Sequence, residues 1–110
     1  MNKSSKYVRF FNYDCEVVIQ TYSQNKQLAI KLVSAETEYN ARQSIFYGLP
    51  IGVATVCLPD HSFDENETAI KIFSENEGIL EALTDAGIIE ETGKFAQCGF
   101  ATIPIVKLIH

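Results

Sequence analysis

The sequence predicts an α+β domain in which an antiparallel β-sheet of about five to six strands packs against one amphipathic helix. Residues 15–22 and 27–33 alternate apolar and polar side chains on either side of a turn at 24–26, as in a β-hairpin. Only residues 74–87 carry a strong helical pattern. With 110 residues, 46% of them hydrophobic and 21% charged, the chain is expected to form a single domain over residues 1–110.

The other predicted strands are rich in aromatic and β-branched side chains and cover residues 7–11, 51–58, 68–73, 95–98 and 100–108. A turn is expected at 12–14 after the first of them. Pro104 lies in the last strand and cannot donate a hydrogen bond to a neighbouring strand. That strand is therefore expected at a sheet edge or with a bulge.

The helix is predicted from three signals along the chain. Ser74 and Glu77 are three residues apart, as in a capping box that satisfies two backbone amides at a helix start. Gly87 is placed to end the helix in the left-handed conformation. The apolar side of this helix comprises Ile79, Leu80, Leu83 and Ala86.

Residues 35–50 match no single pattern. They fit either a short helix followed by a loop or one long mobile loop, and loops of that length are usually functional or poorly ordered. The N-terminal residues lack the apolar core of a secretion signal, and no run of 18 apolar residues occurs. The expected location is the cytoplasm, without a membrane partner.

Charge is distributed unevenly along the chain. Residues 60–91 contain ten acidic residues and one basic residue, Lys71, for a net charge of −9. The remaining residues carry a net charge of +4, which gives −5 overall. Such asymmetry indicates a charged partner, and the acidic region repels nucleic acid.

Motifs for catalysis or cofactor binding fail on spacing. The stretch from Gly87 to Lys94 has five residues between its glycines and Phe95 after the lysine, whereas a P-loop requires four and then Ser or Thr. A structural turn at Thr92-Gly93-Lys94 explains Gly93 better. Counted from Asp60, the loop lacks the glycine and the final carboxylate of a calcium-binding EF-hand. We therefore expect no enzyme activity and no cofactor.

Two alternative functions are kept open. His61 lies among acidic residues, so a small metal-dependent enzyme or module around it is one alternative. Tyr7, Arg9 and Phe11 interleave basic and aromatic side chains on one predicted strand, which is a pattern of single-stranded nucleic-acid binding.

The acidic helix provides the leading candidate site. Glu77, Glu81 and Asp85 are spaced by four and share the side opposite the apolar residues, although like charges at this spacing destabilise a helix. Asp85 also lies near the negative end of the helix dipole. A surface that docks on a basic groove explains this choice of residues. Asp64, Glu65 and Glu67 are expected to adjoin it if the preceding loop folds beside the helix.

The pieces NKQLAIKL, ATVCLP and TGKFAQCGFATIPIVKL, in this order, resemble a family of small proteins of unassigned function. Members of that family are carried on bacterial plasmids, prophages and conjugative elements. The resemblance spans residues 13–108, with 35–50 as an insertion and Cys98 where a small polar residue is usual. It implies a cytoplasmic accessory protein of a mobile element and transfers no catalytic residue.

Small acidic proteins of such elements often bind host defence machinery. The resulting expectation is a non-enzymatic inhibitor of the anti-CRISPR or anti-restriction type. Its partner would be a host protein with a basic surface, with no direct contact to nucleic acid. The oligomeric state is left open by the sequence.

Overall fold

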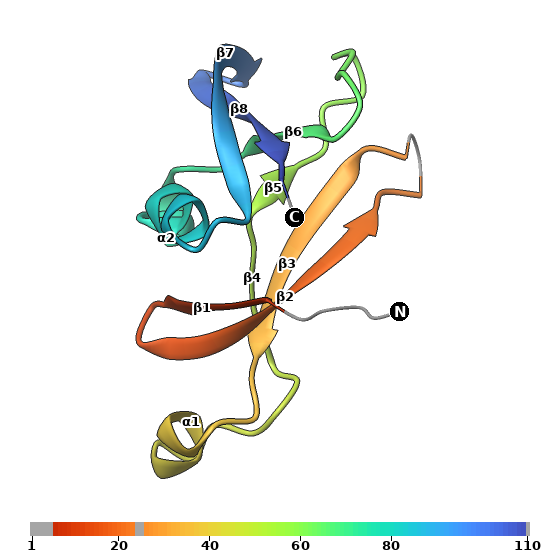
Figure 1. The fold of residues 1–110 in the computed structure, drawn as a ribbon. Coiled ribbons are helices and arrows are strands. Elements are labelled where there is room, and N and C mark those ends of the chain that lie inside the picture. Colours follow the sequence, from red (N-terminus) through yellow and green to blue (C-terminus); the bar gives the residue numbers. More distant parts are fainter. Residues whose placement is uncertain (1–5, 24–25, 110) are drawn as a thin grey trace.

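The computed structural model describes residues 6–23 and 26–109, which form an α+β fold with two antiparallel sheets (Figure 1). The first sheet has the order β1-β2-β3-β4 and contains β1 (Lys6–Phe10), β2 (Tyr13–Thr21), β3 (Leu28–Ser34) and β4 (Pro50–Val53). The second sheet has the order β5-β6-β8-β7 and contains β5 (Thr55–Val56), β6 (Glu67–Ile70), β7 (Ile89–Cys98) and β8 (Ala101–Leu108). The helices are α1 (Glu38–Arg42), the 3₁₀ turn η1 (Ser74–Asn76) and α2 (Ile79–Asp85).

The α+β class and the β2–β3 hairpin are confirmed, but the single sheet of five to six strands is wrong. The segment 51–58, predicted as one strand, is split at Ala54. The amide of Ala54 donates to the carbonyl of Ile30 in the first sheet, and its carbonyl accepts from the amide of Lys71, the residue after β6 of the second sheet. The backbone on either side of Ala54 therefore pairs with different strands, and the chain passes from one sheet to the other.

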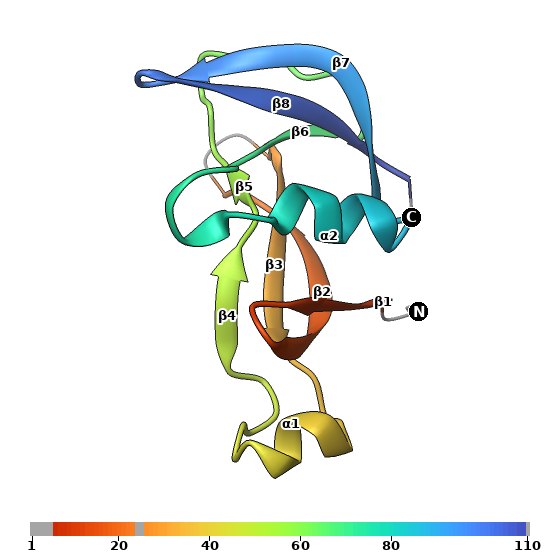
Figure 2. The same ribbon diagram turned by 90° about the vertical axis from the view of Figure 1, so that its left-hand side faces the viewer.

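The core lies between the sheets, and α2 closes its open side. Figure 2 shows α2 between β1 below and β7 above, and α2 contacts both edge strands. Its buried side chains Ile79 and Leu83 join a cluster with Val8, Ile30 and Leu32 from the inner face of the first sheet. The predicted apolar side of the helix is confirmed, because Leu80 and Ala86 also pack against this cluster.

The start of α2 differs from the predicted capping box. Ser74 opens η1 with a φ of 64°, and the α-helix begins only after Gly78, whose φ of 88° is left-handed. No side chain caps either helix start. Ser74 and Glu77 both precede the reversal at Gly78 and share the turn η1, where the amide of Glu77 donates to the carbonyl of Ser74 at 3.4 Å, so they do not cap the first turn of α2.

The end of α2 at Gly87 is confirmed. Gly87 has a φ of 76°, its amide donates to the carbonyl of Thr84, and the amide of Ile88 donates to the carbonyl of Leu83. This pair of bonds is a Schellman motif, and the buried side chains of Ile88 and Leu83 accompany it. The chain is thereby turned from α2 into β7.

Replacing Gly87 with alanine is expected to lower the free energy of unfolding by about 1 kcal/mol, since a Cβ disfavours the left-handed conformation. No atom lies within 4 Å of the added Cβ, so the effect is conformational and not steric. The matched control is Gly52→Ala, where φ is not left-handed and the methyl group would only contact Asn76 Oδ1 at 3.9 Å. Urea unfolding curves measure both, and equal midpoints for the two variants would contradict this account.

The predicted edge position of the last strand is wrong, because β8 lies between β6 and β7. Pro104 is tolerated there because the pairing with β6 stops at Ile105. A register shift between Glu91 and Lys94 occurs in the adjacent pairing with β7, so an irregularity does lie beside the proline.

The segment 35–50 contains α1 followed by a loop, the first of the two predicted possibilities. Asn40 anchors it: the buried amide accepts from the backbone amide of Asp14 at 2.9 Å. The same side chain donates to the carbonyls of Asp14 and Ala35 at 2.8 and 2.9 Å. Ser34 and Thr37 add further bonds to Phe46 and Asp14. Among the described residues no helix is long and apolar enough to cross a membrane.

Candidate functional site

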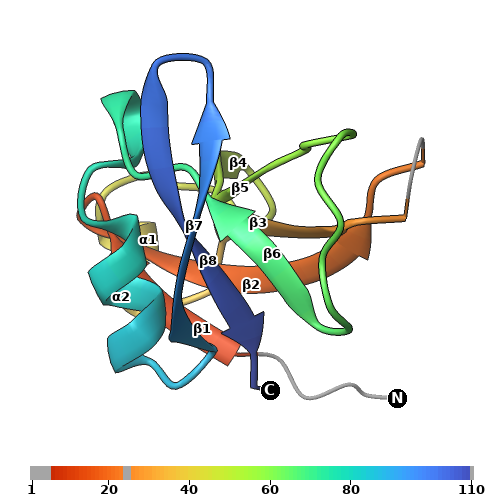
Figure 3. The same cartoon turned by 90° about the horizontal axis from the view of Figure 1, so that it is seen from above.

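The six predicted partner-binding residues form two separate groups. Glu77, Glu81 and Asp85 lie at α2, whereas Asp64, Glu65 and Glu67 lie on the loop 57–66 and at the start of β6. In Figures 1 and 3 this loop and α2 are on opposite sides of β7 and β8. The expected adjoining of the two groups is therefore wrong: β6 leads away from the loop, and the chain reaches α2 only after crossing the second sheet.

The first group is called here the acidic α2 surface and consists of Glu77, Glu81 and Asp85. All three residues are exposed. Glu81 and Asp85 are one turn apart on α2 and share a face, while Glu77 precedes the helix with extended backbone angles. The structure thus retains the cluster but not the predicted stacking of all three carboxylates on one helix.

Ion pairing in the described residues occurs away from the acidic α2 surface. Arg9 pairs with Asp14, Arg42 with Glu38, and Lys94 with Asp64 and Glu67. None of the three carboxylates of the acidic α2 surface takes part in a described ion pair. The same holds for Glu90 and Glu91, which are exposed on β7, the strand that α2 contacts.

A shallow hollow of about 400 Å³ lies beside two residues of the acidic α2 surface, Glu77 and Glu81. Its apolar lining comes from Ile72, which is 38% exposed, and from the half-buried Leu80. Glu77 and Glu81 also line it. Sequence reasoning missed this hollow, because the left-handed turn at Gly78 that brings residue 72 next to the helix leaves no pattern of apolar spacing.

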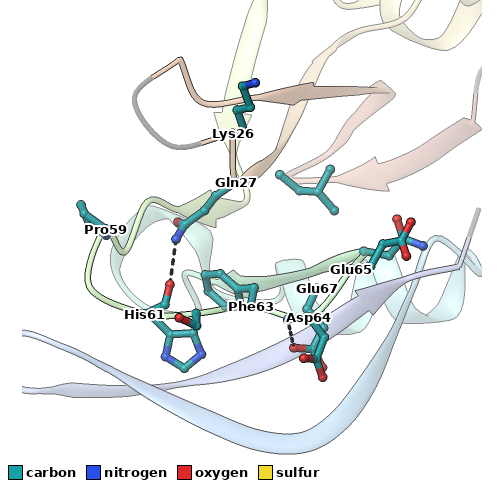
Figure 4. Close-up of a pocket in the computed structure, with 11 residues that line it drawn as sticks. Lys26, Gln27, Pro59, His61, Phe63, Asp64, Glu65 and Glu67 are labelled. Atoms are coloured by element: carbon teal, nitrogen blue, oxygen red, sulfur yellow. Dashed lines mark hydrogen bonds between the residues drawn. The ribbon is translucent and has the colours of Figure 1, made fainter.

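The second group lines a pocket of about 550 Å³ between the loop 57–66 and the end of the β2–β3 hairpin (Figure 4). Gln27 holds the loop through three hydrogen bonds. Its Nε2 donates to the carbonyls of Leu58 and His61, and its Oε1 accepts from the amide of Leu58 at 2.9 Å. The pocket is therefore bounded by an anchored loop.

Glu67 is not available as a free surface acid. Its carboxylate is only 8% exposed, lies 2.7 Å from Lys94 Nζ and accepts from the amide of Asp64 at 3.0 Å. The hydrogen bond from Lys94 is the main reason why the pKa of Glu67 is lowered. Asp64 Oδ2 lies 3.4 Å from the same ammonium group, so two of the three acids share Lys94, whereas Glu65 is exposed and takes part in no described ion pair.

The position of Lys94 depends on a bulge in β7. Thr92 and Gly93 are the extra residues, with a φ of 84° at Gly93, so the predicted turn at 92–94 lies inside one continuous strand. Thr92 Oγ1 donates to the carbonyl of Ile105 at 2.7 Å and accepts from the amide of Lys94 at 3.1 Å. Bulges commonly redirect side chains, and this one accompanies the pairing of Lys94 with Glu67.

Replacing Lys94 with methionine is expected to reduce the loss of stability on acidification. The folded pKa of Glu67 lies below its ordinary value of 4.5, so its contribution is present above that pH and is lost as pH falls through the folded pKa. Without Lys94 the folded pKa rises toward the ordinary value, and the contribution shrinks. Urea midpoints at neutral and acid pH measure the difference, with Lys26→Met, at an exposed lysine without a described ion pair, as the control. Parallel pH profiles for wild type and Lys94→Met would contradict the pairing.

The residues of the metal-module alternative do not form a metal cluster. In the part of the chain that the structure describes, no three His, Cys, Asp or Glu side chains gather as metal ligands. The His61 ring packs against Phe63 with centroids 4.4 Å apart. Of the cysteines, Cys57 and Cys98 are half-buried, and burial raises the pKa of Cys15 to about 11, so that thiol stays protonated at neutral pH.

The residues of the nucleic-acid alternative are partly engaged within the chain. Arg9 Nε donates to Asp14 Oδ1 at 2.6 Å, and its guanidinium lies 3.8 Å from the centroid of the Tyr39 ring. Tyr7 is exposed on β1, whereas Phe11 lies in the turn to β2 with a left-handed φ of 56°. The three side chains therefore do not form one continuous stacking row along a strand.

Comparisons of the chain with protein-family models, with curated proteins and with solved structures find no match.

Proposed function

We propose that this protein is a non-enzymatic binding protein whose acidic α2 surface docks on a basic groove of a host protein. The observation that carries the proposal is the combination of Glu77, Glu81 and Asp85, exposed and without a described ion pair, with a hollow that Glu77 and Glu81 line together with Ile72 and Leu80. By contrast, two of the three acids of the loop group, Asp64 and Glu67, pair with Lys94.

The arrangement is unfavourable for α2 taken alone. Glu81 and Asp85 repel one another at a spacing of four residues, and Asp85 lies in the last turn, where the helix dipole favours a cation. Each effect costs a few tenths of a kcal/mol. The carboxylates destabilise α2 alone, but they would attract the cations of a basic partner. Binding therefore explains these residues, whereas helix stability does not.

The hollow offers apolar contacts, which charged side chains alone do not. Exposed charges mainly raise the association rate and exclude wrong partners, whereas apolar side chains seated in pockets dominate binding energy. An apolar or aromatic side chain of the partner would enter between Ile72 and Leu80, with Lys or Arg beside Glu77 and Glu81. A basic groove that normally holds nucleic acid combines these features, because it pairs cations with aromatic stacking residues.

The expected consequence is inhibition by occupation of the groove. The resemblance to small proteins of plasmids, prophages and conjugative elements supports an accessory protein of a mobile element. It also favours a host defence effector as the target, of the CRISPR or restriction class. In this proposal the protein acts in the cytoplasm and needs no cofactor.

The test is affinity capture from nuclease-treated bacterial lysate at low and high salt, with the captured proteins identified by mass spectrometry. We expect one enriched protein that is lost at high salt, binds nucleic acid on its own, and is released when nucleic acid is added back. An empty capture at both salt concentrations, or a partner that added nucleic acid does not release, would contradict the proposal.

A further inference from the structure

The outer face of the first sheet carries two cross-strand rows that alternate with the buried inner positions. One row aligns Tyr7, Glu16 and Val33 across β1, β2 and β3. The other aligns Val18, Lys31 and Val53 across β2, β3 and β4. Their neighbours Val8, Cys15 and Leu32 belong to the core, so these rows point away from it.

This face is apolar for a surface exposed to solvent. Tyr7 is 58% and Val53 43% exposed, and Tyr47 of the loop after α1 lies over the first row at 61% exposure. The Tyr47 hydroxyl donates to Glu16 Oε1 at 3.5 Å, and the Glu16 carboxylate raises the pKa of Tyr47. Asn40 anchors the segment 35–50 that carries Tyr47, so Tyr47 is held against the sheet.

Charge on the outer face is balanced and locally self-complementary. Glu16 and Lys31 lie on adjacent strands two register positions apart, and neither takes part in a described ion pair. Arg9 and Asp14, which pair with one another, lie two residues farther along the same face, so this face carries two charges of each sign while the whole chain is acidic. A two-fold axis between two facing sheets, passing midway between Glu16 and Lys31, brings each Glu16 opposite the Lys31 of the other copy.

We propose that a second copy of this chain covers the outer face of the first sheet and forms a symmetric dimer, with Tyr7, Tyr47 and Val53 buried between two Glu16–Lys31 pairs. Tyr7, Tyr47 and Val53 are 58%, 61% and 43% exposed, so the face offers large apolar side chains to a second copy. A specific interface buries about 1,200 Å² or more in total, which is the area that the two outer faces have to cover.

The dimer leaves the acidic α2 surface free. Through Ile79 and Leu83, α2 packs against the inner side of the first sheet, opposite the outer face. The dimer would therefore present two acidic α2 surfaces, and a partner with two basic grooves would bind with higher avidity than a single surface allows. The dimer itself does not depend on the proposed function.

The test uses charge reversal in trans. Glu16→Lys places lysine opposite lysine in both pairs of the dimer, and Lys31→Glu places glutamate opposite glutamate. Each variant alone is expected to sediment as a monomer at concentrations where the wild type is dimeric. An equimolar mixture of the two restores opposite charges at both contacts, so we expect a heterodimer. The double variant is expected to form a homodimer.

Sedimentation velocity over a concentration series measures the masses, and Glu65→Lys, an exposed reversal on the loop 57–66, is the control that should stay dimeric. A monomeric wild type at every concentration overturns the proposal. A dimer that persists in Glu16→Lys and Lys31→Glu alike overturns it too, since the interface then lies elsewhere. Circular dichroism of each single variant verifies its fold, and the mixture provides a readout that misfolding cannot mimic.

Discussion

The triple variant Glu77→Lys, Glu81→Lys, Asp85→Lys is expected to weaken binding to the captured partner by about 100-fold or more. Each exposed charge contributes a fraction of a kcal/mol to about 1 kcal/mol, and reversal replaces attraction by repulsion at three positions. Roughly 3 kcal/mol in total corresponds to a loss of about two orders of magnitude in affinity. Isothermal titration calorimetry with the purified partner measures it.

The fold of this variant should be retained. All three positions are exposed, and lysine at 85 suits the end of the helix while lysine at 81 is slightly unfavourable near its start. These opposing changes are a few tenths of a kcal/mol each. The thermal midpoint is therefore expected to stay close to that of the wild type.

A matched control separates location from net charge. Glu36, Asp60 and Glu65 are exposed acids outside the acidic α2 surface, and their reversal changes the net charge by the same amount. This control should keep affinity within a few-fold at moderate salt, where charges beyond a Debye length are screened. If the control loses as much affinity as the triple variant, binding follows overall charge and not the acidic α2 surface.

Replacing Asn40 with alanine is expected to lower the free energy of unfolding by about 2–4 kcal/mol. The substitution removes three hydrogen bonds to the backbone of Asp14 and Ala35 and empties a site that is 1% exposed. A domain of this size is typically stable by only 5–15 kcal/mol, so the loss is a large fraction. Chemical denaturation measures the effect.

Gln43 provides the control for Asn40. It also carries an amide just beyond α1, but it is exposed and its two bonds, to the carbonyls of Asn12 and Tyr39, are both 3.4 Å long. Gln43→Ala is expected to change stability by less than about 0.5 kcal/mol. Equal effects for the two alanine variants would show that segment 35–50 is not anchored through Asn40.

Local patterns predicted the parts of the fold that depend on neighbouring residues. Alternation in 15–22 and 27–33 identified the β2–β3 hairpin, and the apolar spacing with Gly87 identified the body and the end of α2. Both signals act within a few residues, so they are visible in the chain itself. The capping box failed because the left-handed turn at Gly78 overrides it.

Features that depend on distant contacts could not be predicted in the same way. The division into two sheets depends on Ala54, whose residue type does not distinguish it from a residue inside a regular strand. Glu67 was predicted as a partner-binding residue, and its pairing with Lys94 was missed because Lys94 is 27 residues away and follows a bulge in β7. The acids of the acidic α2 surface could be selected from the sequence, because the positions of charged residues are read directly from it, whereas strand register is not.

The central claim is that the acidic α2 surface and nucleic acid compete for one groove of the partner. Fluorescence anisotropy of labelled nucleic acid, bound to the purified partner and titrated with this protein, tests that claim most directly. We predict that the anisotropy falls to the value of free nucleic acid with the wild type and stays high with the triple lysine variant. A ternary complex, in which the protein binds while the nucleic acid remains bound, would contradict the claim.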